Sequence, residues 1–289
     1  MGNSISSPEK IRTVHSGAVT EAVRRMYISA NCTLPDDVRR RIAECRAIED
    51  WPPAAETLDC LVENYELAER NNIPICQDTG VACVFVEMGQ DVHIQGDLNE
   101  AIHEGIRQGC REGYLRASVV ADPIRRVNTK DNTPAMVYFD IVPGDGLNIT
   151  VAPKGFGSEN MSQIAMLPPS GGLDGVKALV LKTVEEAGPN PCPPVVVGVG
   201  IGGTFDKAAL LAKKALLRQL DDRHPDPYYA ALEDELLESV NALGIGPQGF
   251  GGRTTALGVK ILVMPTHIAG LPVAVNLNCH VARHMSEGL

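Results

Sequence analysis

The sequence lacks several features that would place the protein in familiar classes. Its longest apolar stretches, such as residues 195–203, are far shorter than the roughly 18–20 residues that span a bilayer, so no transmembrane helix is expected. It also lacks a basic excess, because the net charge is −10, which argues against binding to nucleic acid or to an anionic membrane. No internal repeat and no low-complexity linker is present. With 44% apolar residues, a soluble globular protein is expected.

The amino terminus has no pattern typical of a secretory signal, because residues 3–10 are mostly polar and no apolar segment follows them. The first residues match a short pattern for myristoylation at Gly2, which is easily met by chance. The eight cysteines are therefore expected to be reduced thiols or metal ligands rather than disulfides. We expect a cytoplasmic protein.

The pattern of apolar residues predicts an α/β fold, in which an amino-terminal helical segment precedes mixed β-sheets flanked by helices. In residues 1–70, Ser7 is expected to cap a helix that has Pro8 at its first position and Ile11, Val14, Ala18 and Val19 at helical spacing. Two further helices are expected over residues 38–48 and 58–68. Predicted strands and helices then alternate. The expected strands are residues 81–87, 136–142, 147–152, 195–199, 259–264 and 273–277, and the expected helices are residues 98–113, 175–187, 207–220 and 227–243.

A single domain over residues 1–289 is expected, with residues 1–70 as its helical lead-in. The proline-rich segment 189–194 suggests a seam between two α/β subdomains, residues 71–190 and 191–289.

The cysteines fall into two groups. Five lie on apolar faces or in connections, where a small buried side chain is the ordinary interpretation: Cys32, Cys45, Cys60, Cys83 and Cys110. Cys76, Cys192 and Cys279 each lie at a turn beside a predicted strand, where a fold can direct several thiolates to one point. Spacing alone is weak support for a three-cysteine metal site, because long segments separate the three residues.

Three glycine-rich stretches have the composition of binding loops. Residues 154–160 follow a strand and suit a backbone cradle for an anion, although they do not form a P-loop. Residues 198–203 have the wrong glycine spacing for a dinucleotide-binding turn, and residues 246–252 indicate a tight turn. Near such turns, Asp78, Arg116 and His267 are candidate functional groups, but a single arginine is usually a surface charge and His267 suits a hydrogen-bonded core equally well.

Several motifs, taken in order, resemble one family. They are Cys-Gln-Asp-Thr-Gly at 76–80, Leu-Arg-Ala-Ser at 115–118, Asn-Thr-Lys-Asp-Asn-Thr-Pro-Ala at 128–135, residues 154–160, Asn-Pro-Cys-Pro-Pro at 190–194, residues 243–249, Pro-Thr-His at 265–267 and Asn-Cys-His at 278–280. Over residues 71–284 the chain resembles the α subunit, equivalent to the amino-terminal domain, of class I iron–sulfur fumarases and the related L-tartrate dehydratases.

The resemblance implies a [4Fe–4S] cluster held by Cys76, Cys192 and Cys279, with the fourth iron open to substrate. It implies that Asp78 and His267 belong to the catalytic acid network. It further implies contacts to a small dicarboxylate from Gln77, Asp78, Arg116, Gly155, Ser158, Glu159, Asn160, Met161, Ser162, Gln163, Ile164 and His267.

The implied activity is the reversible hydration of fumarate to (S)-malate, in an active site completed by a separate β subunit. The residues at 116–118, 128–135 and 158–160 look like the fumarase branch, and the α subunit of an L(+)-tartrate dehydratase is the alternative. A different class also has to be considered, namely a non-enzymatic protein that holds a metal in a closed four-ligand site, or a thiol-rich domain that holds none.

Overall fold

The computed structural model describes residues 11–289, so the expectations for Gly2, Ser7 and Pro8 lie outside the described residues. The chain forms two compact units that are not consecutive in sequence. Of the described residues, the first unit takes 11–33, 76–154 and 283–289, and the second takes 34–75 and 155–282. The chain therefore crosses between the units near residues 33, 75, 154 and 282, and the expected seam at 189–194 lies inside the second unit.

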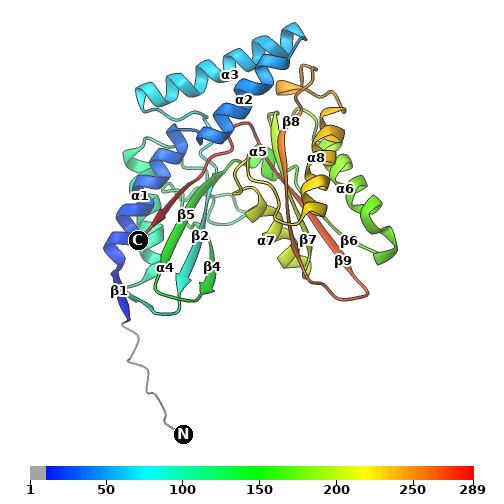
Figure 1. Ribbon diagram of the computed structural model, residues 1–289. Coiled ribbons are helices and arrows are strands. Elements are labelled where there is room, and N and C mark those ends of the chain that lie inside the picture. Colours follow the sequence, from blue (N-terminus) through cyan, green and yellow to red (C-terminus); the bar gives the residue numbers. More distant parts are fainter. Residues whose placement is uncertain (1–10) are drawn as a thin grey trace. The chain divides into compact units, whose positions relative to one another are not determined.

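The first unit is built on a four-stranded sheet in the order β10-β5-β2-β4. Helices α1 (Ser16–Cys32) and α4 (Leu98–Glu112) pack together against it (Figure 1). Alternate β2 residues Ala82, Val84 and Val86 join these helices in one apolar core, because alternate side chains of a strand point to the same face of its sheet. The strands are β10 (Met285–Gly288), β5 (Leu147–Lys154), β2 (Val81–Gly89) and β4 (Met136–Val142), and β1 (Arg12–His15) pairs in parallel with β3 (Val92–Gln95).

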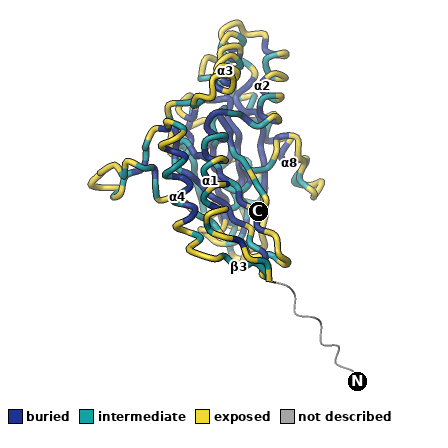
Figure 2. Tube along the Cα trace, turned by 90° about the vertical axis from the view of Figure 1, so that its left-hand side faces the viewer, coloured by how far each residue is buried: buried dark blue, intermediate teal, exposed yellow. Residues whose placement is uncertain are grey.

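The second unit has a four-stranded sheet in the order β6-β9-β7-β8. Its central strand β9 (Leu271–Asn278) is antiparallel to β6 (Gln163–Leu167) and β7 (Val195–Gly202), and β7 is parallel to β8 (Ala256–Met264). Strands β7 and β9 are almost wholly buried, whereas α3 is exposed along much of its length (Figure 2). The helices are α2 (Asp36–Ile48), α3 (Pro52–Asn71), α5 (Phe156–Glu159), α6 (Gly172–Ala187), α7 (Phe205–Ala215) and α8 (Pro227–Asn241), with 3-10 turns at Pro169–Gly171 and Pro247–Gly249.

The α/β class and all six predicted strands are confirmed, with ends that differ by a few residues. The expected helix that begins near Ser7 and includes Ile11 and Val14 is wrong over residues 12–15, which form β1. Backbone pairing of β1 with β3 outweighs the helical spacing of the apolar residues there. Among residues 11–289, no helix combines the length and the apolar character needed to cross a membrane.

The glycines at 198–203 serve packing. Gly198 and Gly200 lie within β7, and a Cβ on either would come within 2.2 Å of a backbone carbonyl oxygen of α7, at Ala212 and Ala208 respectively. Their lack of side chains therefore lets α7 lie directly against the sheet. This explains why the stretch resembles a dinucleotide-binding turn only in composition.

Candidate functional site

Cys192 and Cys279 lie at the same end of the sheet of the second unit. Cys192 stands three residues before β7 and Cys279 follows β9 directly, and these antiparallel strands pair Val196 with Asn278 at this end. The backbone N–H of His280 donates to the Cys192 carbonyl at 3.3 Å, and His280 Nδ1 donates to the same oxygen at 3.0 Å. The fold thus brings together two cysteines that are far apart in the sequence.

A neighbouring turn supports the backbone around Cys192. The N–H and the side-chain Nε2 of Gln248 each donate to the Pro193 carbonyl at 2.7 Å. Gln248 and Cys192 both have left-handed backbone angles, with φ of 52° and 55°, which non-glycine residues adopt at a cost. Sequence analysis assigned no site role to Gln248 or His280, although the turn at 246–249 and the Asn-Cys-His motif were visible.

The segment 155–162 lies at this same end. Ser162 Oγ accepts hydrogen bonds from Asn276 Nδ2 at 2.8 Å and from the Leu277 N–H at 3.1 Å, close to the end of β9. A Cβ on Gly157 would lie 3.4 Å from the carbonyl oxygen of Asn190, two residues before Cys192. The predicted anion-binding segment is therefore adjacent to the backbone of both cysteine loops.

Within that segment, Glu159 is engaged by its own unit. Its Oε1 pairs with Lys213 Nζ at 2.6 Å, and its Oε2 accepts from Asn276 Nδ2 at 2.8 Å. Ser158 is buried and its hydroxyl donates to the Gly155 carbonyl at 3.2 Å. Ion pairing balances the Glu159 charge, so this carboxylate does not oppose an approaching anion as strongly as an isolated one would. The exposed part of the segment includes Gly157 and Asn160.

His267 lies elsewhere in the second unit. It is exposed in the connection between β8 and β9, whereas Cys279 is at the other end of β9. The eight residues of β9 span about 25 Å at ~3.3 Å per residue. His267 Nδ1 accepts from the Ala269 N–H at 3.2 Å. The structure therefore does not bring His267 to the end of the sheet that holds Cys192 and Cys279.

Cys76 belongs to the first unit, at a tight turn that leads into β2. The Asp78 N–H points to Cys76 Sγ at 3.4 Å, and Asp78 Oδ1 accepts from the Gly80 N–H at 2.9 Å. Cys76 and Asp78 are half-buried and Gln77 is exposed, with its Oε1 3.3 Å from Cys76 Sγ. The turn thus combines one thiol with two polar side chains that solvent can reach.

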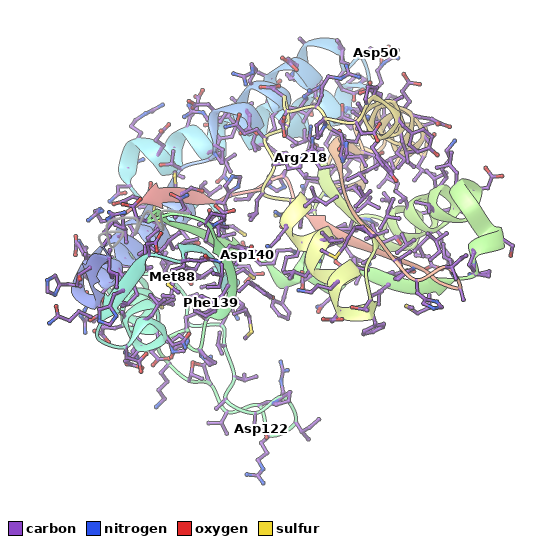
Figure 3. The ribbon with its side chains drawn as sticks, turned by 60° about the horizontal axis from the view of Figure 1, so that its bottom comes forward. Asp50, Met88, Asp122, Phe139, Asp140 and Arg218 are labelled. Atoms are coloured by element: carbon purple, nitrogen blue, oxygen red, sulfur yellow. The ribbon has the colours of Figure 1, made fainter. Side chains whose placement is uncertain are left out.

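A buried asparagine joins this turn to the segment that carries Arg116. Asn132 Nδ2 donates to the Gly80 carbonyl at 2.9 Å and to the Tyr27 hydroxyl at 2.7 Å, and its Oδ1 accepts from the Ser118 N–H at 2.7 Å. Burial raises the pKa of Tyr27, so the hydroxyl stays neutral. Arg116 is exposed beside this network, and the loop that follows extends away from the sheet of its unit, with Asp122 near its tip (Figure 3).

Substituting Asn132 with alanine is expected to lower the free energy of unfolding by about 2–4 kcal/mol, because several buried donors and acceptors lose their partner at once. Urea denaturation of the full chain measures the change. Asn71→Ala is the control, since exposed Asn71 makes one local bond to the Leu67 carbonyl, and its effect should stay within about 0.5 kcal/mol. Equal effects of the two variants would contradict the central role of Asn132.

The donor set suits a metal group with soft ligands. Burial raises the pKa of the Cys32, Cys45 and Cys110 thiols, which disfavours the thiolate that a metal needs. Cys76 and Cys279 are half-buried and Cys192 is exposed, all at turns. Among residues 11–289, no group of three or more His, Cys, Asp or Glu side chains is arranged to hold a metal ion; Cys76 lies in one unit, and Cys192 and Cys279 lie in the other.

Sequence analysis also missed Arg283. This residue is 3% exposed, and its Nη2 donates to the carbonyls of Asp78 and Thr79 at 2.5 and 3.3 Å. The sequence offers no signal for it, because a lone arginine near a chain end is ordinarily a surface charge. Its contact with the Cys76–Gly80 turn is visible only in the folded unit.

Comparison with known proteins agrees with these observations. A profile described as Fumarate hydratase (Fumerase) matches residues 20–287. A protein of Methanocaldococcus jannaschii, provisionally named as L(+)-tartrate dehydratase subunit alpha, is 42% identical over 272 residues, covering 92% of this chain and 95% of its own. The L(+)-tartrate dehydratase subunit alpha of Escherichia coli K12 is 34% identical over 269 residues, covering 92% of this chain and 88% of its own. Matches of this extent, together with the adjacent loops that carry Cys192 and Cys279, show that the chain belongs to the fumarate hydratase family of hydro-lyases.

Proposed function

We propose that this chain is the α subunit of a two-subunit hydro-lyase that hydrates fumarate to (S)-malate at a [4Fe–4S] cluster held by Cys76, Cys192 and Cys279. One observation carries the proposal: a chain of this family places the two cysteine loops of its second unit beside the segment 155–162, at one end of a sheet. A structural metal protein would need four closed ligands, and it would not need an exposed thiol such as Cys192.

The cluster would supply a Lewis-acidic iron with an open position for the substrate hydroxyl and carboxylate. The residues of this chain bind and orient the dicarboxylate. Exposed Arg116 offers a planar guanidinium that matches a carboxylate in bidentate fashion. Gln77 and the backbone of residues 155–164 offer neutral hydrogen-bonding groups. Asn132 holds the backbone at Ser118, two residues after Arg116, and so limits the motion of the segment that carries the guanidinium.

Of the two proposed members of the acid network, Asp78 is the better candidate to protonate the leaving hydroxide. Hydroxide is a poor leaving group and needs a proton donor within hydrogen-bond reach. Asp78 lies two residues from a proposed ligand and has one carboxylate oxygen held by the Gly80 N–H, which fixes its orientation. His267 is separated from Cys279 by the whole length of β9, so a role in the same step would require another route to the cluster.

A separate β subunit is part of the proposal. The curated relatives described above are named as α subunits, which supports a second polypeptide. We assign to it the remaining carboxylate contacts and the base that removes the carbon-bound proton. The isolated chain is then expected to bind a cluster but to turn over little substrate. A cytoplasmic location is proposed with it, because the cluster requires reduced thiols.

A second candidate, L(+)-tartrate dehydratase, is favoured by the names of the same relatives. Both reactions remove water from a small hydroxylated dicarboxylate. Both would therefore use the Arg116 guanidinium to bind a carboxylate and the open iron to bind the hydroxyl. The motifs at 116–118, 128–135 and 158–160 support the choice of fumarate.

Substrate preference distinguishes a fumarate hydratase from an L(+)-tartrate dehydratase. With the chain co-expressed with its β subunit and purified without oxygen, we expect kcat/KM for fumarate and (S)-malate to exceed that for L(+)-tartrate at least tenfold. (R)-Malate serves as the stereochemical control and should not react. A preference for L(+)-tartrate would assign the second activity, and no hydro-lyase activity in an iron-replete complex would contradict both.

A further inference from the structure

Arg283 is a buried cation with unused hydrogen-bonding capacity. Only 3% of the residue is exposed, yet neither Nε nor Nη1 has an acceptor among the described residues. Its Nη2 alone is engaged, by the carbonyls of Asp78 and Thr79. The partner carbonyls belong to the turn that carries Cys76, so the unused donors lie next to that turn.

A guanidinium is charged at any physiological pH, and its burial is unfavourable without an opposite charge and acceptors for its N–H groups. Two backbone carbonyls supply partial charge only. An anionic group near the turn would balance the remainder. Within the first unit, the Asp78 carboxylate of the same turn is one such group, and Cys76 becomes a second as a thiolate; a [4Fe–4S] core with thiolate ligands also carries net negative charge.

We propose that Arg283 is a positioning residue for the first cluster ligand: it fixes the Cys76–Gly80 turn through two consecutive carbonyls and places a positive charge beside the thiolate. The charge-balancing half of this inference rests on the proposed function, whereas the turn-fixing half rests on the contacts of the first unit alone. Lysine could keep the charge but not these two contacts, because its side chain is one atom shorter than that of arginine and its nitrogen would stop short of the position that Nη2 occupies. The two halves can therefore be separated by substitution.

The test compares Arg283→Gln and Arg283→Lys in the full chain with its β subunit, purified without oxygen. Hydrogen exchange of the Asp78, Thr79 and Gly80 amides should be at least tenfold faster in both variants, since neither side chain places a donor at the position of Nη2. The cluster midpoint potential should fall in Arg283→Gln, where the nearby positive charge is lost, and should stay close to wild type in Arg283→Lys.

Arg12→Gln is the matched control, because Arg12 Nη1 also donates to a backbone carbonyl of the first unit, that of Asp145 at 2.9 Å, but away from the turn. It should change neither readout. Wild-type exchange and wild-type potential in Arg283→Gln would overturn the inference. If Arg283→Gln does not accumulate as folded protein, unchanged turn exchange in Arg283→Lys overturns the positioning role instead.

These measurements distinguish failure of the Arg283 proposal from failure of the proposed function. Wild-type protein without iron or sulfide would contradict the cluster and, with it, the charge-balancing role, while the exchange measurement on the same protein would still confirm or overturn the turn-fixing role.

Discussion

Replacing Cys192 with serine is expected to remove most of the iron from the complex and to lower hydro-lyase activity by about a thousandfold or more. Serine matches the size of cysteine, and the Cys192 carbonyl that accepts from His280 is untouched, so the turn should persist. A hydroxyl, however, does not replace a thiolate as a ligand for an iron–sulfur core. Iron and acid-labile sulfide, measured after purification without oxygen, report the loss directly.

Cys60→Ser provides the control, because Cys60 is exposed like Cys192 but lies on α3, where it lines a pocket with Gln248 and is not a proposed ligand. It should retain about four iron atoms per chain and full activity. A Cys192→Ser complex with the same iron content as wild type would remove Cys192 from the ligand set. Circular dichroism of both variants checks that the fold is intact.

The parts of the fold that the sequence revealed are those whose local pattern and tertiary role agree. Residues 136–142 and 195–199 are rich in β-branched residues and form strands as expected. The failures occur where distant pairing decides the structure. Residues 12–15 satisfy helical spacing but pair with β3, and β10 has the weak strand sequence Met-Ser-Glu-Gly, which is held by β5.

In the candidate site, too, local sequence pattern revealed some residues, whereas contacts between distant segments determine the others. Turn chemistry indicates Cys76, Cys192 and Cys279 as candidates, and in the fold the last two lie at one end of a sheet. The strand predicted at residues 273–277 already separates His267 from Cys279, but sequence could not reveal which strand ends lie together in the fold. Nor could it reveal Asn132 and Arg283, which act on backbone groups far away in the sequence, through contacts that leave no periodic signal.

Asp78→Asn is expected to lower kcat by about a hundredfold to ten-thousandfold while the iron content stays at the wild-type level. Asparagine keeps an Oδ1 acceptor for the Gly80 N–H, so the turn that carries Cys76 should be preserved. The amide cannot donate an acidic proton to the leaving hydroxide. If Asp78 protonates the leaving group, the loss appears in kcat; if it only binds substrate, KM rises with kcat unchanged.

Asp122→Asn is the control that separates loss of an acidic proton from a change in turn geometry. Asp122 Oδ1 accepts from the Ile124 N–H at 2.9 Å, the same spacing that Asp78 uses, but in the loop that extends from the sheet of its unit (Figure 3). Its substitution should leave kcat within about twofold of wild type, because asparagine serves equally well as the turn acceptor. Wild-type kcat in Asp78→Asn would show that another group provides the proton. Because β9 separates His267 from Cys279 in the second unit, that result would favour a donor on the β subunit over His267.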